Sequence, residues 1–72
     1  MHEVDARGLA CPLPLLKAKQ ALNQLNSGEQ LKVLATDEGS VRDFKTFAEL
    51  SGNALLESTE ENGCYQYLLQ KA

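Results

Sequence analysis

The chain has 72 residues, 43% of them apolar and 24% charged, with a formal net charge of −3 at neutral pH. This length and composition predict one small globular domain over residues 1–72 and exclude a disordered chain. The negative charge argues against direct nucleic-acid binding, which requires a basic surface. No apolar run approaches the roughly 18 residues that cross a membrane, and the first residues lack the features of a secretory signal. We therefore expect no membrane association and a cytoplasmic, reducing location.

The chain begins with a predicted strand and helix. Residues 2–6 alternate between apolar and polar, which is typical of a short strand. Gly8 ends this strand and is expected to allow a close approach to the following helix. A helical pattern then runs from residue 12 to about residue 26, with Gly28 as its expected C-cap. The core-facing stripe of this helix consists of Leu15, Ala18, Leu22 and Leu25, with Ala21 beside them.

A second strand and a second helix follow. Residues 31–36 are apolar on both faces, which predicts a central position in a sheet. Ser40 and Asp43 form an S-x-x-D pattern, which predicts that the next helix begins at Ser40. Gly52 closes that helix. Its buried side is expected to comprise Val41, Phe44, Phe47, Ala48 and Ser51.

The last segment predicts a β-hairpin. Strands are expected over residues 53–60 and 64–70, and the Asn62-Gly63 pair between them favours a type I′ turn. The element order is therefore βαβαββ. Because each strand–helix–strand unit crosses over right-handedly, both helices should cover one face of the sheet. The predicted fold class is α/β, as a two-layer α+β sandwich with a mixed four-stranded sheet whose other face is open to solvent or a partner.

The candidate catalytic residue is Cys11, at the junction of the first strand and the first helix. Pro12 and Pro14 follow it, and proline is tolerated in the first turn of a helix. Cys11 is thus expected at or next to the N-cap, where the helix dipole lowers the pKa of a thiol. The alternative is a small buried residue that fills the junction. The rigid Cys-Pro-x-Pro turn favours a nucleophilic or carrier thiol.

Other thiol chemistries lack the residues that they need. A disulfide oxidoreductase requires a nearby second cysteine, and Pro14 occupies nearly that place. A protease or amidase requires a histidine base, and the only histidine is His2, close to the start of the chain. A metal site built from Cys11, Cys64 and His2 is weakly supported, and no cofactor is expected. Cys64 is interpreted as structural or incidental, in preference to a redox role. A thiolate without a base suits a residue that receives and passes on a group, such as sulfur held as a persulfide.

The residues around Cys11 have two readings each. Arg7, Lys17 and Lys19 lie near it in sequence, and they either contact a partner or the persulfide anion or form an ordinary solvated face. Leu13 and Leu16 point away from the core stripe of the first helix. They are either an apolar docking patch or leucines covered by a loop or the sheet edge.

Two carboxylates near the motif are also open to two readings. Asp5 either orients the Cys11 loop or partner contacts, or is a solvated or turn-capping residue. Asp37 is interpreted as a loop residue whose side chain caps the N–H group of Gly39 or Ser40, in preference to a proton donor.

The run from Asp5 to Pro14, D-x-x-G-L-x-C-P-x-P, resembles the signature of the TusA/SirA-like sulfur-carrier family, and the resemblance extends over the whole chain. It implies a persulfide on Cys11, with Asp5, Gly8, Pro12 and Pro14 supporting the motif. Asp37 and Asp43 match acidic positions of the family, whereas Glu38 stands where many members have proline.

The resemblance also implies the partners. The sulfur donor is expected to be a cysteine desulfurase or a rhodanese-type protein, and a downstream protein accepts the sulfur. The resemblance implies a pathway of tRNA thiolation, molybdenum-cofactor maturation or a related sulfur pathway. The protein is expected to be a sulfurtransferase-type carrier in preference to a stand-alone enzyme. The alternatives are a regulatory or nucleic-acid or protein interaction module, whose fold also occurs in a translation initiation factor, and a thiol redox sensor.

Overall fold

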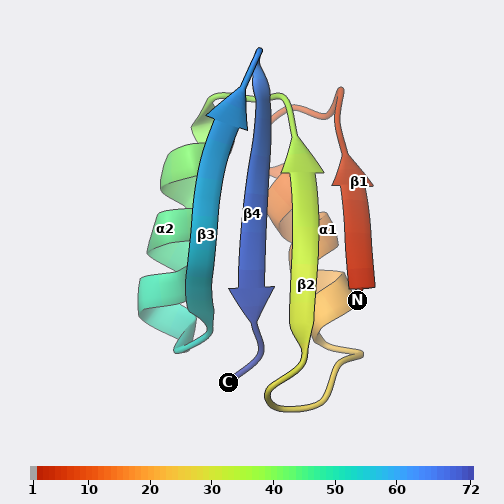
Figure 1. Cartoon of the computed structure of the whole chain (residues 1–72), viewed down its shortest axis with the longest axis vertical. Helices are drawn as coiled ribbons and strands as arrows, with labels where there is room; N and C mark the ends of the chain where they lie inside the picture. The colour runs from red at the N-terminus through yellow and green to blue at the C-terminus, as the bar shows by residue number, and fades with distance from the viewer. Residues whose placement is uncertain (1) are drawn as a thin grey trace.

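The computed structural model describes residues 2–72 as two helices packed on a four-stranded sheet (Figure 1). The elements in chain order are β1 (His2–Ala6), α1 (Leu13–Leu22), β2 (Gln30–Ala35), α2 (Gly39–Ser51), β3 (Ala54–Glu61) and β4 (Cys64–Gln70). The strand order is β1-β2-β4-β3, with β1 parallel to β2 and the other pairs antiparallel. This confirms the predicted βαβαββ sandwich with a mixed sheet. Over residues 2–72 no helix has the length and apolar character needed to span a membrane.

The core fills the space between the sheet and the helices, both of which lie on one face (Figure 1). The strict alternation of β2 sends three side chains into this core, and the predicted central position of β2 is confirmed. Helix α1 contributes Ala18 and Leu22, while Leu15 is half-buried beside them. The fully or nearly fully buried set is completed by Leu25, Leu31, Val33, Ala35, Phe44, Tyr67 and Leu69.

Tyr67 makes two contacts inside this core, one with an aromatic ring and one with a hydroxyl group. The rings of Phe44 and Tyr67 stack with centroids 4.4 Å apart. The Ser40 hydroxyl donates to the carbonyl oxygen of Asp37 at 2.7 Å, so it accepts the hydrogen bond from the Tyr67 hydroxyl, also at 2.7 Å. The prediction that Ser40 begins the helix is therefore wrong. Helix α2 begins at Gly39, and Ser40 faces the core because its hydroxyl satisfies a buried tyrosine.

Tyr67→Phe is expected to destabilise the protein by about 1 kcal/mol, the usual contribution of one hydrogen bond to stability. Ser40 keeps its bond to Asp37 in this variant, so no second group is left unpaired. Urea denaturation of the variant measures the loss. Tyr65→Phe is the matched control, since Tyr65 is only half-buried. Equal free energies of unfolding for Tyr67→Phe and the wild type would show that the buried bond contributes nothing.

Two turn predictions are confirmed, and the predicted role of Gly28 as a helix cap is wrong. Gly52 adopts a left-handed conformation as the C-cap of α2, and the Asn62-Gly63 turn has positive φ at both residues. Helix α1, however, ends at Leu22, well before the expected glycine cap. The Lys71 ammonium donates to the Leu22 carbonyl at 2.7 Å and so caps this helix end. The N–H of Gly28 instead donates to the Lys71 carbonyl at 2.8 Å.

The buried side of α2 is narrower than predicted. Phe44 is fully buried, but Val41 is 43% exposed and Ser51 is exposed. Helix α2 packs over β3 and β4, and β3 is the edge strand. The sheet therefore offers no further strand to cover the flank of the helix that carries Val41.

Candidate functional site

Cys11 lies exposed in the loop between β1 and α1, directly before the N-cap residue Pro12. The expected position next to the N-cap and the place of Pro14 in the first helical turn are confirmed. The structure adds that Cys11 also packs against the first turn of α2. A Cβ atom at Gly39 would lie 3.3 Å from the Cβ of Cys11 and 3.6 Å from its Sγ. Gly39 is thus the glycine that permits close packing at the cysteine.

Gly8 has a different role from the one predicted. No atom lies within 4 Å of the position of its missing Cβ, so close approach to the helix does not explain it. Its φ of +83° places it in the left-handed region, which favours glycine. The N–H group of Gly8 donates to the Thr36 hydroxyl at 2.8 Å, which ties the loop that carries Cys11 to the end of β2.

The Cys11 sulfur donates a hydrogen bond to the carboxylate of Asp43 on α2. This bond raises the pKa of Cys11, as do partial desolvation and the negative charges of Asp43 and Asp37, while the Arg42 guanidinium opposes the shift. The prediction of a lowered pKa is therefore wrong for the isolated protein. An ionised carboxylate beside the sulfur favours the neutral thiol, and this effect outweighs the dipole of α1.

Asp37 fixes the start of α2 beside the cysteine. Its Oδ2 accepts the Gly39 N–H at 2.9 Å, and its backbone carbonyl accepts the Ser40 N–H at 3.1 Å. The capping interpretation of Asp37 is thus confirmed. A Cβ at Gly39 would lie 2.8 Å from Asp37 Oδ2, so a side chain there would displace the cap.

Asp5 and Arg7 form a pair that stabilises the turn after β1. The Arg7 side chain donates to both oxygens of Asp5, each at 2.9 Å, and the Arg7 backbone N–H donates to one of them at 3.1 Å. The side-chain hydrogen bond from Arg7 lowers the pKa of Asp5 to about 2. The turn-capping alternative for Asp5 is confirmed, and the Arg7 side chain is held by Asp5.

The two predicted lysines lie on opposite flanks of α1. Lys17 lines a shallow hollow beside Glu3 and Asp5 of β1. The Nζ atom of Lys19 lies 5.5 Å from the centre of the Phe47 ring, towards α2. Among the described residues, the cation that acts on the Cys11 pKa is Arg42, which the sequence did not single out.

Leu13 and Leu16 are 46% and 45% exposed, so neither a loop nor the sheet edge covers them. Both belong to the first half of α1, which follows Cys11 directly. A docking role for these two leucines remains a prediction.

A groove of about 670 Å³ runs between the two helices. Leu15, Phe47 and Leu50 supply its apolar lining, with Lys19 and Arg42 on its walls. Asp43 also lines this groove, and it is the residue that contacts the Cys11 sulfur. The carboxylate therefore connects the cysteine with a surface that is open to a partner.

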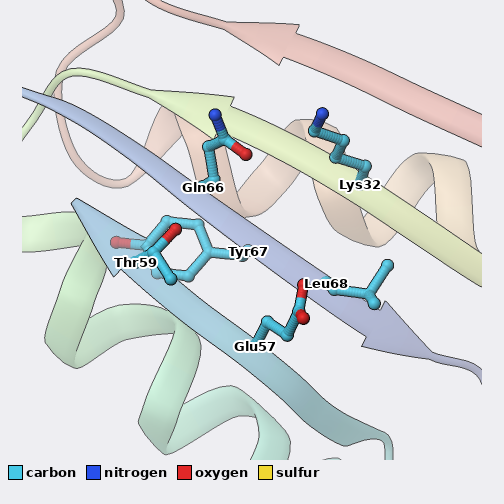
Figure 2. A pocket seen from close by; sticks show the side chains of 6 residues that line it. All are labelled: Lys32, Glu57, Thr59, Gln66, Tyr67 and Leu68. Carbon is cyan, nitrogen blue, oxygen red and sulfur yellow. The ribbon is translucent and has the colours of Figure 1, made fainter. Parts of the chain in front are cut away.

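The opposite, open face of the sheet carries a smaller hollow of about 190 Å³. Figure 2 shows side chains of β2, β3 and β4 around it, among them Lys32, Glu57 and Gln66.

Cys64 lies on this face by the alternation of β4, and both cysteines are free thiols. Within residues 2–72, no three His, Cys, Asp or Glu side chains gather as metal ligands.

Several known proteins are similar to this chain in sequence. A family model described as Sulfurtransferase TusA matches residues 2–71. The sulfur carrier protein TusA of Allochromatium vinosum is 54% identical over 71 residues, which cover 99% of this chain and 93% of the relative. The putative sulfur carrier protein YrkI of Bacillus subtilis is 43% identical, covering 94% of this chain and 91% of the relative.

A solved structure shares the fold. The crystal structure of a SirA-like protein from Desulfitobacterium hafniense is similar with a TM-score of 0.85 and 30% sequence identity. The similarity covers 97% of this chain and 96% of that protein. The two-layer sandwich is therefore common to both chains.

Proposed function

The chain belongs to the TusA family of sulfurtransferases, and on this premise we propose that it carries sulfur as a persulfide on Cys11. The observation that carries the proposal is an exposed free thiol in a Cys-Pro-x-Pro turn, held between the starts of α1 and α2. The sulfur-carrier relatives support a role in sulfur relay. A carrier needs a donor and an acceptor, so we treat the protein as one member of a relay and not as a stand-alone enzyme.

The transfer that we propose is a thiol–persulfide exchange. The Cys11 sulfur attacks the outer sulfur of a donor persulfide, and a new S–S bond forms on Cys11. The S–S bond of the donor breaks, and the departing donor thiolate takes up the proton that Cys11 loses. Atoms and electrons balance without an external oxidant. The same exchange in reverse passes the sulfur to an acceptor thiol.

We infer that the donor is a cysteine desulfurase or a rhodanese-type protein, and that the acceptor belongs to tRNA thiolation, molybdenum-cofactor maturation or a related sulfur pathway. The exposed Leu13 and Leu16 support docking of such proteins next to Cys11. A reducing cytoplasm suits the role, because it keeps Cys11 available as a thiol.

The redox-sensor alternative has less support. Sensor cysteines are typically exposed thiols of low pKa. The hydrogen bond to Asp43 raises the pKa of Cys11, which disfavours rapid reaction with peroxides. A relay partner, by contrast, brings its own reactive sulfur to the site.

The proposal predicts that a cysteine desulfurase supplied with cysteine adds one sulfur atom to the intact protein. Intact mass spectrometry measures the addition, and peptide mapping should place it on the peptide that contains Cys11. Treatment with dithiothreitol should remove it, and omission of cysteine is the control. Failure to gain sulfur from both a desulfurase and a rhodanese-type donor would contradict the carrier function.

A further inference from the structure

The contact between Cys11 and Asp43 joins the loop before α1 to helix α2, which are far apart in sequence. Gly39 and Asp43 lie four residues apart on α2 and therefore face the same side of this helix. Gly39 leaves room for the cysteine, and Asp43 accepts the hydrogen bond from its sulfur. Helix α2 thus packs against the thiol and places a carboxylate beside it.

We propose that Asp43 holds the proton of Cys11 in the free protein, and so restrains the reaction of this thiol with small electrophiles until a donor protein has docked. The proposal concerns a positioning residue, since Asp43 acts through Cys11. It rests on the proposed carrier function for its biological meaning. Its chemical content, the reactivity of Cys11 in the free protein, does not depend on sulfur transfer.

The charges around the sulfur favour this restraint. A carboxyl group is a stronger acid than a thiol by several pKa units, so at neutral pH the shared proton stays on sulfur. A Cys11 thiolate would lie against the carboxylate of Asp43 and near that of Asp37, and like charges at close range disfavour ionisation. Arg42 is the cation that opposes them. The two carboxylates raise the pKa of Cys11 and Arg42 lowers it. The pKa is raised overall, so the carboxylates have the larger effect.

The position of Asp43 also explains how docking relieves the restraint. Its side chain lines the groove between α1 and α2, so a partner seated there reaches the carboxylate. A cationic group of the donor that pairs with Asp43 neutralises its charge and lets Cys11 ionise. The proton then passes to the departing thiolate of the donor, as the exchange requires. A small molecule provides no such group.

Asp43→Asn tests the proposal in a Cys64→Ser background, where Cys11 is the single thiol. The rate of alkylation by iodoacetamide is measured as a function of pH. We expect the midpoint of the profile to move to lower pH and the rate at pH 7 to rise severalfold. A fall of one unit in a thiol's pKa raises the thiolate population about tenfold and lowers its nucleophilicity about threefold, so the net gain is about threefold per unit.

Two control variants separate charge from structure. Glu49→Gln makes the same charge change on an exposed position of α2 and should leave the profile unchanged. Asp43→Glu keeps the carboxylate and should retain a profile closer to that of the wild type. If Asp43→Asn fails to fold by circular dichroism, Asp43→Ser removes the same charge with a smaller side chain.

Sulfur loading supplies the second measurement. Asp43→Asn should accelerate loading from inorganic polysulfide more than loading from the desulfurase, so the ratio of the two rates favours the desulfurase less than in the wild type. An alkylation profile that stays in place or moves to higher pH overturns the role of Asp43. A wild-type protein that takes no sulfur from any donor overturns the carrier function instead, while the alkylation profile still decides the role of Asp43.

Discussion

Cys11→Ser is expected to abolish sulfur loading completely. A serine hydroxyl cannot form the S–S bond in which a persulfide is stored, so the loss is not a matter of degree. The substitution should leave the fold intact, since Cys11 is exposed and the serine hydroxyl retains a donor for Asp43. Intact mass spectrometry after incubation with a cysteine desulfurase and cysteine measures the result, as a protein without added sulfur.

Cys64→Ser is the matched control for this experiment, because it removes the other thiol of the chain. Cys64 begins β4 at the hairpin, on the face of the sheet away from the helices. This variant should gain one sulfur at the wild-type rate. Sulfur loading that is absent in Cys64→Ser and present in Cys11→Ser would contradict this assignment and identify Cys64 as the carrier residue.

The elements of the fold could be predicted from sequence because their signals are local. The alternation of β1 and β4 and the Asn62-Gly63 turn each depend on neighbouring residues. The helix boundaries could not be predicted as well, because distant residues decide them. Lys71 caps α1 at Leu22, and Tyr67 draws the Ser40 hydroxyl into the core. Neither partner is visible in the residues next to the helix end.

The candidate site also contains residues that could be predicted from the sequence and residues that could not. Cys11 could be identified from the sequence because its prolines follow it directly. Gly39 and Asp43 lie far along the chain, and no spacing pattern connects them with the cysteine. The cations that are close to Cys11 in sequence proved a poor guide to its surroundings, since the Arg7 side chain is held by Asp5.

The direction of the Cys11 pKa shift was missed for a physical reason. The dipole of α1 acts as about half a charge at the helix end, whereas Asp43 places a full negative charge at hydrogen-bond distance. The sequence supplied the helix and its dipole but not the carboxylate that opposes it. A thiol at a helix N-terminus is therefore activated only if no acidic side chain of another element reaches it.

Phe44→Ala is expected to cost about 3–5 kcal/mol of folding free energy, the usual range for removing a buried aromatic ring. Phe44 is fully buried at the centre of α2, and its ring stacks on Tyr67 with a centroid distance of 4.4 Å. A protein of this size has a total stability of about 4–11 kcal/mol, at 0.05–0.15 kcal/mol per residue. The variant should therefore lose between about a quarter and all of its stability, which urea denaturation measures as a lower midpoint.

Leu50→Ala on the same helix is the control, because Leu50 is 83% exposed and loses little buried area on truncation. Surface substitutions of this kind usually change stability by less than about 0.5 kcal/mol. The contrast between the two variants tests whether α2 is held by its inward face around Phe44. Since this face also fixes Gly39 and Asp43 against Cys11, the Phe44→Ala protein that remains folded should show a broadened or shifted pH profile of Cys11 alkylation. Similar losses in the two variants would contradict the packing of α2 described above.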